Sequence, residues 1–282
     1  MYGLKVENDR GNTLELTGNP NYTVFKIEGL NPPPATVNRA VNTTTDGSSI
    51  NSVRLESRNL VIYMTVNGDI EANRINLYKY FPVKKKVKIF FNNESRNVYI
   101  EGVVELIECD QFTSRQVAQI SLICPQPYFK EVNELTSIFS DVSPLFSFPF
   151  NIAENGVEVS AITTNQRKSI INAGDIETGA IIKLFAIGTV VNPILYDVLK
   201  RTHLKLNFTM LPSDTIVINT NVGEKSIELI RDGVTYNALG YMLPDSTWFN
   251  LEAGDNVFTY DADSGNSNLQ ITFTTSILYS GV

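Results

Sequence analysis

Apolar and polar residues alternate along much of the chain with a period of two, the pattern of β-strands that face a core on one side. In the first half this alternation predicts three consecutive strands, each with one apolar face. These faces hold Val87, Ile89 and Phe91; Val98, Ile100, Val104 and Leu106; and Ala118, Ile120, Leu122 and Cys124. Earlier strands are predicted over residues 22–30, 49–55 and 60–66, with an exposed polar loop over 42–49.

The period changes once in this half, from two to that of an α-helix. Asp69 is a natural N-cap, and Pro82 cannot continue a helix. Between them, one helical face carries Ile70, Leu77, Tyr78 and Phe81. The sequence therefore predicts one helix over 69–82, inside a mainly β region.

The second half is predicted to be almost entirely β. Over 171–197 a turn at 172–175 leads into a strand pattern that Gly188 interrupts and that Asn192-Pro193 ends, because proline cannot donate to a central ladder. Further strands are predicted over 215–220, 227–231, 257–260 and 269–273, with a hairpin turn at Asp232-Gly233. Short strands at this spacing predict a β-sandwich.

Length and charge divide the chain in two. At 282 residues it exceeds one typical domain, and its net charge of −7 is concentrated beyond residue 130, where acidic residues outnumber basic ones about two to one. We expect an α+β domain over 1–138 and a β-sandwich over 139–282, joined by a segment with a helical turn at 128–135. No apolar run approaches the ~20 residues of a membrane-spanning helix, so no membrane partner is expected. The acidic half also disfavours non-specific nucleic-acid binding.

Candidate chemistry is sparse. The single histidine, His203, lies beside Lys200, Arg201 and Lys205, with no carboxylate near it in sequence, which favours a surface or strand-edge position. The chain lacks a nucleophile elbow, a phosphate-binding glycine loop and a His/Cys zinc pattern. We therefore expect no enzyme, with no catalytic, cofactor-binding or metal-binding residues.

Two polar or reactive features have ordinary interpretations. Residues 261–266 resemble the start of a calcium loop, but Thr272 stands where the closing glutamate belongs, so a polar hairpin tip is favoured over a calcium site. Cys109 and Cys124 lie in apolar strand patterns and are expected to be buried free thiols.

The strongest basic run is Lys84-Lys85-Lys86-Val87-Lys88. Its alternation into an apolar strand favours lysines that protect a sheet edge against aggregation over a nucleic-acid surface. A third interpretation places these lysines along the polar channel of a ring.

Trp248, the only tryptophan, lies in a polar segment between Pro244 and Asn250. An aromatic ring in such a loop can stack on a sugar, which makes Trp248 a candidate carbohydrate contact. Packing at the end of a sandwich is the favoured alternative, since large aromatic side chains mostly serve cores.

Several motifs, in this order, resemble those of the distal tail protein (Dit) family of bacteriophages with long non-contractile tails. They are the helix followed by three strands, the sequence Cys-Pro-Gln-Pro-Tyr-Phe at 124–129, Asn-Ala-Gly-Asp at 172–175 with Gly179, Gly188 and Asn192-Pro193, the pattern Leu251-x-x-Gly254-x-Asn256, and the closing strand pattern at 279–282. Gln126 departs from the family, in which an acidic residue is common at this place.

The resemblance implies a structural protein of the phage tail tip, without enzymatic activity or cofactors. The first domain would form a homohexameric ring on the tail tube protein, with a central channel through which DNA only passes. The second would be a galectin-like sandwich that carries receptor-binding or accessory baseplate proteins, next to a tail-associated lysin or tail fibre protein. At this length the chain would be the compact form without inserted carbohydrate-binding modules, assembled in the bacterial cytoplasm and carried in the virion.

Two other functions are weighed against this one. A carbohydrate-binding β-sandwich module of a phage or cell-surface protein would rest on Trp248. An accessory domain of a glycoside hydrolase is disfavoured, because no pair of catalytic carboxylates can be nominated.

Overall fold

The computed structural model describes residues 2–41, 46–113, 115–144, 160–164 and 167–282. The chain divides into two compact units, Met1–Val132 with Leu278–Val282, and Asn133–Ile277. The predicted division at residue 138 differs from these units in two respects. The change of unit falls at Val132, and residues 278–282 return to the first unit.

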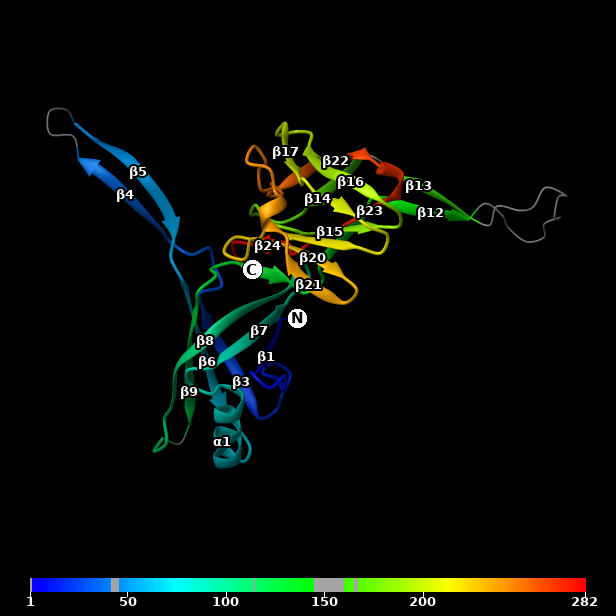
Figure 1. The fold of residues 1–282 in the computed structure, drawn as a ribbon. Helices are drawn as coiled ribbons and strands as arrows, with labels where there is room; N and C mark the ends of the chain where they lie inside the picture. Colours follow the sequence, from blue (N-terminus) through cyan, green and yellow to red (C-terminus); the bar gives the residue numbers. More distant parts are fainter. Residues whose placement is uncertain (1, 42–45, 114, 145–159, 165–166) are drawn as a thin grey trace. The chain divides into compact units, whose positions relative to one another are not determined.

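A nine-stranded antiparallel sheet forms the first unit (Figure 1). Seven of its strands follow the order β2-β1-β7-β8-β9-β6-β3, while β10 pairs with β8 and β24 pairs with β10. Their bounds are β1 (Gly3–Glu7), β2 (Thr13–Glu15), β3 (Tyr22–Glu28), β6 (Arg58–Val66), β7 (Lys86–Asn92), β8 (Asn97–Cys109), β9 (Val117–Cys124), β10 (Phe129–Glu131) and β24 (Leu278–Tyr279). The predicted alternation is confirmed in β7, where Val87, Ile89 and Phe91 are buried between exposed ends.

The predicted helix is confirmed as α1 (Ile70–Tyr80). The Asp69 carboxylate accepts a hydrogen bond from the Ala72 N–H at 3.2 Å, which satisfies one of the free donors of the first turn. Leu77 and Phe81 are fully buried, so the face predicted from the sequence packs on the core of the first unit.

Residues 278–282 complete the first unit. In place of the predicted helical turn at 128–135, residues 129–131 form β10, which pairs with β24 in the register Phe129 to Tyr279. Although 279–282 were predicted as closing strands of the sandwich, they lie beside the first unit's sheet. Both connections to the second unit therefore leave from one antiparallel strand pair.

Arg58 connects three parts of the chain beside the β10–β24 strand pair. Arg58 as a whole residue is 2% exposed, and its guanidinium lies 4.6 Å from the centre of the Phe129 ring. It donates to four backbone carbonyls from three parts of the chain: Pro127 at 2.7 Å, Asn31 at 2.7 Å, Ser280 at 2.6 Å, and Gly29. Charge-assisted bonds of this kind compensate the cost of removing the guanidinium from water.

The second unit is a β-sandwich of two antiparallel sheets. One sheet has the order β11-β23-β15-β19-β20-β21, and the other has the order β14-β22-β16-β17 with β18 beside β16. The bounds are β11 (Leu135–Ile138), β14 (Arg167–Asn172), β15 (Ile181–Ala186), β16 (Val190–Asp197), β17 (Thr202–Lys205), β18 (Thr209–Met210), β19 (Thr215–Asn219), β20 (Ser226–Arg231), β21 (Val234–Asn237), β22 (Gly254–Ser264) and β23 (Leu269–Thr275), with 3-10 helices η1 (Leu239–Tyr241) and η2 (Asn266–Asn268). Phe273 lies at the centre of the core, with its ring centre 5.2 Å from that of Phe139 and 4.9 Å from that of Phe258.

The segment 171–197 differs from its prediction. Gly188 falls at the turn where the chain leaves β15 in one sheet and enters β16 in the other, and a Cβ there would meet the Asn268 side chain at 2.7 Å. Pro193 does not end a strand but lies inside β16, between β22 and β17. The positive φ of 50° at Asn192 kinks the strand just before the proline, and this irregularity accommodates the missing donor.

Two separate hairpins complete the fold. β12 (Ser140–Pro144) pairs with β13 (Ser160–Thr164) in the second unit, and β4 (Ala35–Val41) pairs with β5 (Ser48–Leu55) in the first. The second of these hairpins, residues 35–55, is called the arm below.

Candidate assembly surface

His203 lies on β17, an edge strand of its sheet, as the sequence predicted. Its Nε2 is 3.3 Å from Oδ2 of Asp245, a carboxylate that sequence inspection missed because it lies far along the chain. The Thr247 N–H donates to the His203 carbonyl at 2.7 Å, so the same loop is fixed to the edge strand twice. The contact between His203 and Asp245 therefore helps to hold the loop that contains Asp245 and Thr247 against the edge strand β17.

The acidic segment at 261–266 is not a hairpin tip. β22 runs to Ser264 in one sheet and β23 begins at Leu269 in the other, so the segment connects two sheets. The Asp263 carboxylate accepts from Lys205 Nζ at 2.8 Å and from Asn192 Nδ2 at 2.7 Å, and the ammonium of Lys205 lowers the pKa of Asp263. Within the residues that the structure describes, no three His, Cys, Asp or Glu side chains gather in a metal-binding arrangement.

Both cysteines are free thiols of the first unit. Cys124 is fully buried, and burial raises its pKa to about 11, whereas Cys109 is only half-buried. The prediction of buried thiols is thus confirmed for Cys124 and holds only in part for Cys109.

The predicted edge position of the lysine run is wrong. β7 lies between β1 and β8, so Lys86 and Lys88 belong to an interior strand. Lys88 Nζ lies 3.8 Å from Glu101 Oε1 and 5.5 Å from the Tyr99 ring centre, while Lys85 Nζ lies 3.9 Å from Asp9 Oδ2. Lys5 lies 4.6 Å over the Phe90 ring, and by the strand registers this side of the sheet also holds Glu7, Glu15 and Glu101, so it carries both signs of charge beside its aromatic rings.

Trp248 packs against the sandwich core while part of its ring stays accessible. The ammonium of Lys225 lies 5.6 Å over that ring. A sugar stacking there would have to displace a cation–π contact worth about 0.5–1 kcal/mol at an exposed site. This geometry favours the packing interpretation, and a carbohydrate contact stays a prediction.

The arm has two unlike faces, which follow from its register. Residues that stand opposite each other across an antiparallel pair share a face. One face holds Ala35, Val37, Arg39, Val41, Ser48, Ile50, Val53 and Leu55, and the other holds Thr36, Asn38, Ala40, Ser49, Ser52 and Arg54. The second face is bonded within itself, since Asn38 Nδ2 donates to Ser52 Oγ at 3.0 Å.

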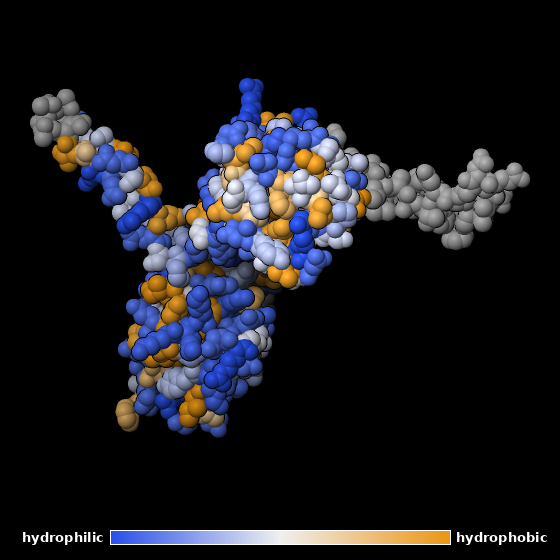
Figure 2. Space-filling view, viewed as in Figure 1, coloured by the Kyte–Doolittle hydropathy of each residue, from blue (hydrophilic) through white to orange (hydrophobic). Residues whose placement is uncertain are grey.

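The apolar face of the arm lies open to solvent (Figure 2). Val41 is 76% exposed, Ile50 66% and Val53 57%. In the described residues β4 and β5 pair only with each other, and an isolated two-stranded hairpin is marginally stable in water. An exposed apolar face on such a hairpin marks an interaction surface.

Only half of the arm is predicted from the sequence. The strand over 49–55 is predicted, whereas 35–41 carries no strand prediction, because three prolines precede it and Asn38 and Arg39 interrupt its apolar residues. The spacing of Ala35, Val37 and Val41 is the signal that would have found it.

A second open surface is the outer side of the β11-β23-β15-β19-β20-β21 sheet, called the outer sheet face below. Along each strand, the residues of this face alternate with buried residues such as Ile182, Leu184 and Ile216. From the strand registers it comprises Thr136, Ile138, Ile181, Lys183, Phe185, Thr215, Val217, Asn219, Ser226, Glu228, Ile230, Thr235, Asn237, Gln270, Thr272 and Thr274. Lys183 and Glu228 are the only charged members of this set, whereas sheet faces that meet water normally carry many charges.

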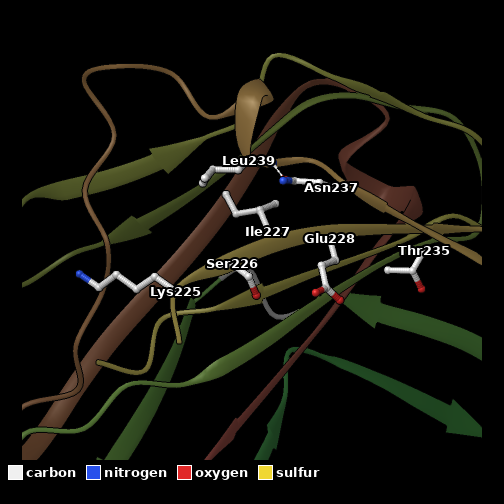
Figure 3. Close-up of a pocket in the computed structure, with 7 residues that line it drawn as sticks. All are labelled: Lys225, Ser226, Ile227, Glu228, Thr235, Asn237 and Leu239. Carbon is white, nitrogen blue, oxygen red and sulfur yellow. Dashed lines mark hydrogen bonds between the residues drawn. The ribbon is translucent and has the colours of Figure 1, made fainter. Parts of the chain in front are cut away.

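A shallow depression lies at one end of the outer sheet face, and its polar lining comes from Lys225, Ser226, Glu228, Thr235 and Asn237. Figure 3 shows the Glu228 carboxylate between Ser226 and Thr235. Trp248 is not among the residues that line it. The depression is a feature of the sheet face, since most of its lining belongs to β20 and β21.

Across the described residues, the one α-helix is too short to cross a membrane.

Comparison with known proteins finds similarity to phage tail proteins. Residues 173–276 match the family model described as siphovirus-type tail component, C-terminal domain. The crystal structure of SPP1 Dit (gp 19.1), described as a paradigm of hub adsorption apparatus in phages that infect Gram-positive bacteria, is similar with a TM-score of 0.69, 14% identity and 98% coverage of both chains. A chain of the phage P2 baseplate in its activated conformation is similar with a TM-score of 0.54, 11% identity and 98% coverage of both. No protein of curated function matches the sequence.

Proposed function

We propose that this chain is a structural hub of the phage tail tip, because residues 173–276 match the family model of a siphovirus-type tail component and the whole chain is similar in fold to SPP1 Dit. Six copies form a ring that joins the tail tube protein to receptor-binding or other baseplate proteins. DNA passes through the central channel without being bound, and the protein acts by holding partners, without catalysis.

The arm is the observation that supports this proposal most directly. Six apolar side chains on its open face would cost little to bury and are costly to leave in water, at about 25 cal/mol per Å² of apolar surface. A surface patch that fits a different patch of an identical copy gives a head-to-tail contact, and such contacts form a ring where the rotation from copy to copy closes.

The full match in length supports the compact form. SPP1 Dit and this chain cover each other to 98%, which leaves no room for a large inserted module. The second unit then serves as the attachment platform for a tail-associated lysin, tail fibre or accessory baseplate protein. The assembled ring belongs to the virion and forms in the host cytoplasm.

Native mass spectrometry and negative-stain electron microscopy of the purified chain test the ring, alone and with the tail tube protein. We expect hexamers with a central opening, with a population that rises with protein concentration. A matched variant, Val37→Ser with Val53→Ser, should stay folded and lose the hexamer.

Monomers only, at high concentration and in the presence of the tube protein, would overturn the proposal. A hexamer that survives the double substitution would keep the hub and remove the arm from its interface.

A further inference from the structure

We propose that the depression on the outer sheet face is a binding site for one residue of a neutral saccharide. Its lining comes from β20 and β21, the last two strands at one end of the sheet, from Lys225 just before them and from Leu239 just after them. The inference goes beyond the structural role of the hub, because it gives the second unit a ligand of its own.

The strand register gathers the polar side chains of the lining on one face. Glu228 stands opposite Asn237, and Ser226 and Thr235 lie two residues from them along their own strands, so all four share a side of the sheet. The depression measures about 200 Å³. Pockets for drug-sized ligands occupy roughly 300–1,000 Å³, so this one suits a single small unit such as one sugar residue.

These four side chains keep hydrogen-bonding groups for a ligand. Within the part of the chain that the structure describes, the side chains of Glu228, Ser226 and Thr235 make no hydrogen bond or ion pair. Asn237 Oδ1 accepts from the Leu239 N–H at 2.9 Å, which orients the amide and leaves its NH₂ group as a donor. The depression therefore offers a carboxylate acceptor, an amide donor and two hydroxyl groups that can do both.

The charges around the depression favour a neutral ligand. Lys225 and Glu228 are the charged residues of the lining, and Lys183 lies two strands from Glu228 on the same sheet face. Figure 3 shows the Lys225 side chain directed away from Glu228, and its ammonium lies 5.6 Å over the Trp248 ring. An anion would meet the Glu228 carboxylate, and a cation would leave the amide donor of Asn237 unpaired.

A sugar residue matches this set of groups. Two neighbouring hydroxyl groups of a sugar can donate to the two oxygens of one carboxylate, and the remaining sugar oxygens can accept from an amide and from hydroxyl groups. Leu239, 44% exposed, adds an apolar wall against which the C–H face of the ring can pack. Trp248 lies beyond Lys225, so its ring is not needed to hold a single sugar residue.

Binding by one copy is expected to be weak, because the depression is shallow and each new hydrogen bond replaces one to water. We expect a dissociation constant on the order of 1 mM. Six such sites on one particle would bind a surface of repeating saccharides with an avidity on the order of 10²–10⁴ above that of one site. This consequence rests on the proposed hub, whereas the site itself does not.

Saturation-transfer-difference NMR of the full chain tests the site, with glucose, galactose, rhamnose and N-acetylglucosamine as the probes. We expect transfer to at least one of them. The dissociation constant should rise about tenfold in Glu228→Ala, which removes the carboxylate, and severalfold in Thr235→Val, which removes one hydroxyl group at unchanged shape. Lys183→Ala, on the same face but outside the lining, is the matched control and should bind like the unsubstituted chain.

The absence of transfer to all four sugars would overturn the proposal. Binding that survives in Glu228→Ala and disappears in Trp248→Ala would overturn it too, because the ligand would then lie on the tryptophan. Equal weakening in Glu228→Ala and Lys183→Ala would show that no defined site exists. Circular dichroism checks that the variants fold, and Glu228→Gln replaces Glu228→Ala if that chain does not. Ring formation is measured separately by native mass spectrometry, so failure of the sugar site leaves the hub standing and failure of the ring leaves the sugar site standing.

Discussion

Strands β5 and β6 follow one another with two residues between them, yet they have opposite environments. In β6, Ile62 and Met64 are fully buried, whereas in β5 Ile50 and Val53 are more than half exposed. β6 has a neighbour on each side, β3 and β9, while among the described residues β5 pairs with β4 alone. Burial of an apolar strand is thus decided by the neighbours and the covering layer that the fold supplies.

Arginine residues show the same contrast. Arg58 begins β6 and is almost fully enclosed by carbonyl acceptors and the Phe129 ring. Arg54, near the end of β5, lies in solvent with Glu56 Oε1 at 3.5 Å. One arginine is buried and the other, four positions away, is exposed. Substituting each in turn therefore tests how much the environment of an arginine contributes to the free energy of unfolding.

The largest effect is expected for Arg58→Met. The substitution leaves the carbonyls of Pro127, Asn31 and Ser280 without their donor, and bonds to a charged group contribute about 1.5–3 kcal/mol each. Unfolding in urea should show a loss of at least about 3 kcal/mol in the transition of the first unit. Arg54→Met is the matched control and should leave that transition unchanged.

Equal stability of the two arginine variants would break the comparison. It would mean that residues 278–282 and the segment at 29–31 are held by their backbone pairing alone.

A smaller effect is expected for Asp214→Asn in the second unit. The Asp214 carboxylate is 2% exposed and accepts from Arg231 Nε at 2.8 Å and from the Leu211 N–H at 2.7 Å. Arg231 is one-third exposed, so solvent screens the pair, and we expect a loss of about 1–2 kcal/mol in the free energy of unfolding at neutral pH.

The pH dependence sharpens this prediction. The bond from Arg231 lowers the pKa of Asp214 below its ordinary value of 3.8, so its contribution is fully present above that value. It is lost as the pH falls through the lowered pKa of the folded state, and the difference between the native chain and Asp214→Asn should shrink in the same range. A difference that stays constant from pH 6 to pH 2 would assign the effect to packing.

The sequence predicted what depends on local pattern. Val87, Ile89 and Phe91 identified β7 by alternation, and Asp69 with Pro82 bounded α1, because side-chain period and capping act over a few residues. The sequence did not predict features that depend on pairing between segments far apart along the chain. Lys88 lies on an interior strand because β1 pairs with β7 across most of the first unit, and the kink at Asn192 lets Pro193 enter a ladder. The open surfaces were missed for the same reason, since the apolar residues of β5 look like core residues until the absence of a covering layer is known.

The smallest effect on the isolated chain, and the most informative for assembly, is expected for Val53→Ser. Its side chain is 57% exposed on the apolar face of the arm, so the free energy of unfolding of the monomer should change by no more than about 0.5 kcal/mol. Ile62→Ser on the neighbouring strand removes a fully buried side chain and should cost at least about 3 kcal/mol. Ring formation, followed by native mass spectrometry, should weaken in Val53→Ser at unchanged stability, because each copy loses one apolar contact with its neighbour. A Val53→Ser chain that unfolds as easily as Ile62→Ser would show that the arm is covered within its own chain, and that the two strands do not differ as the structure indicates.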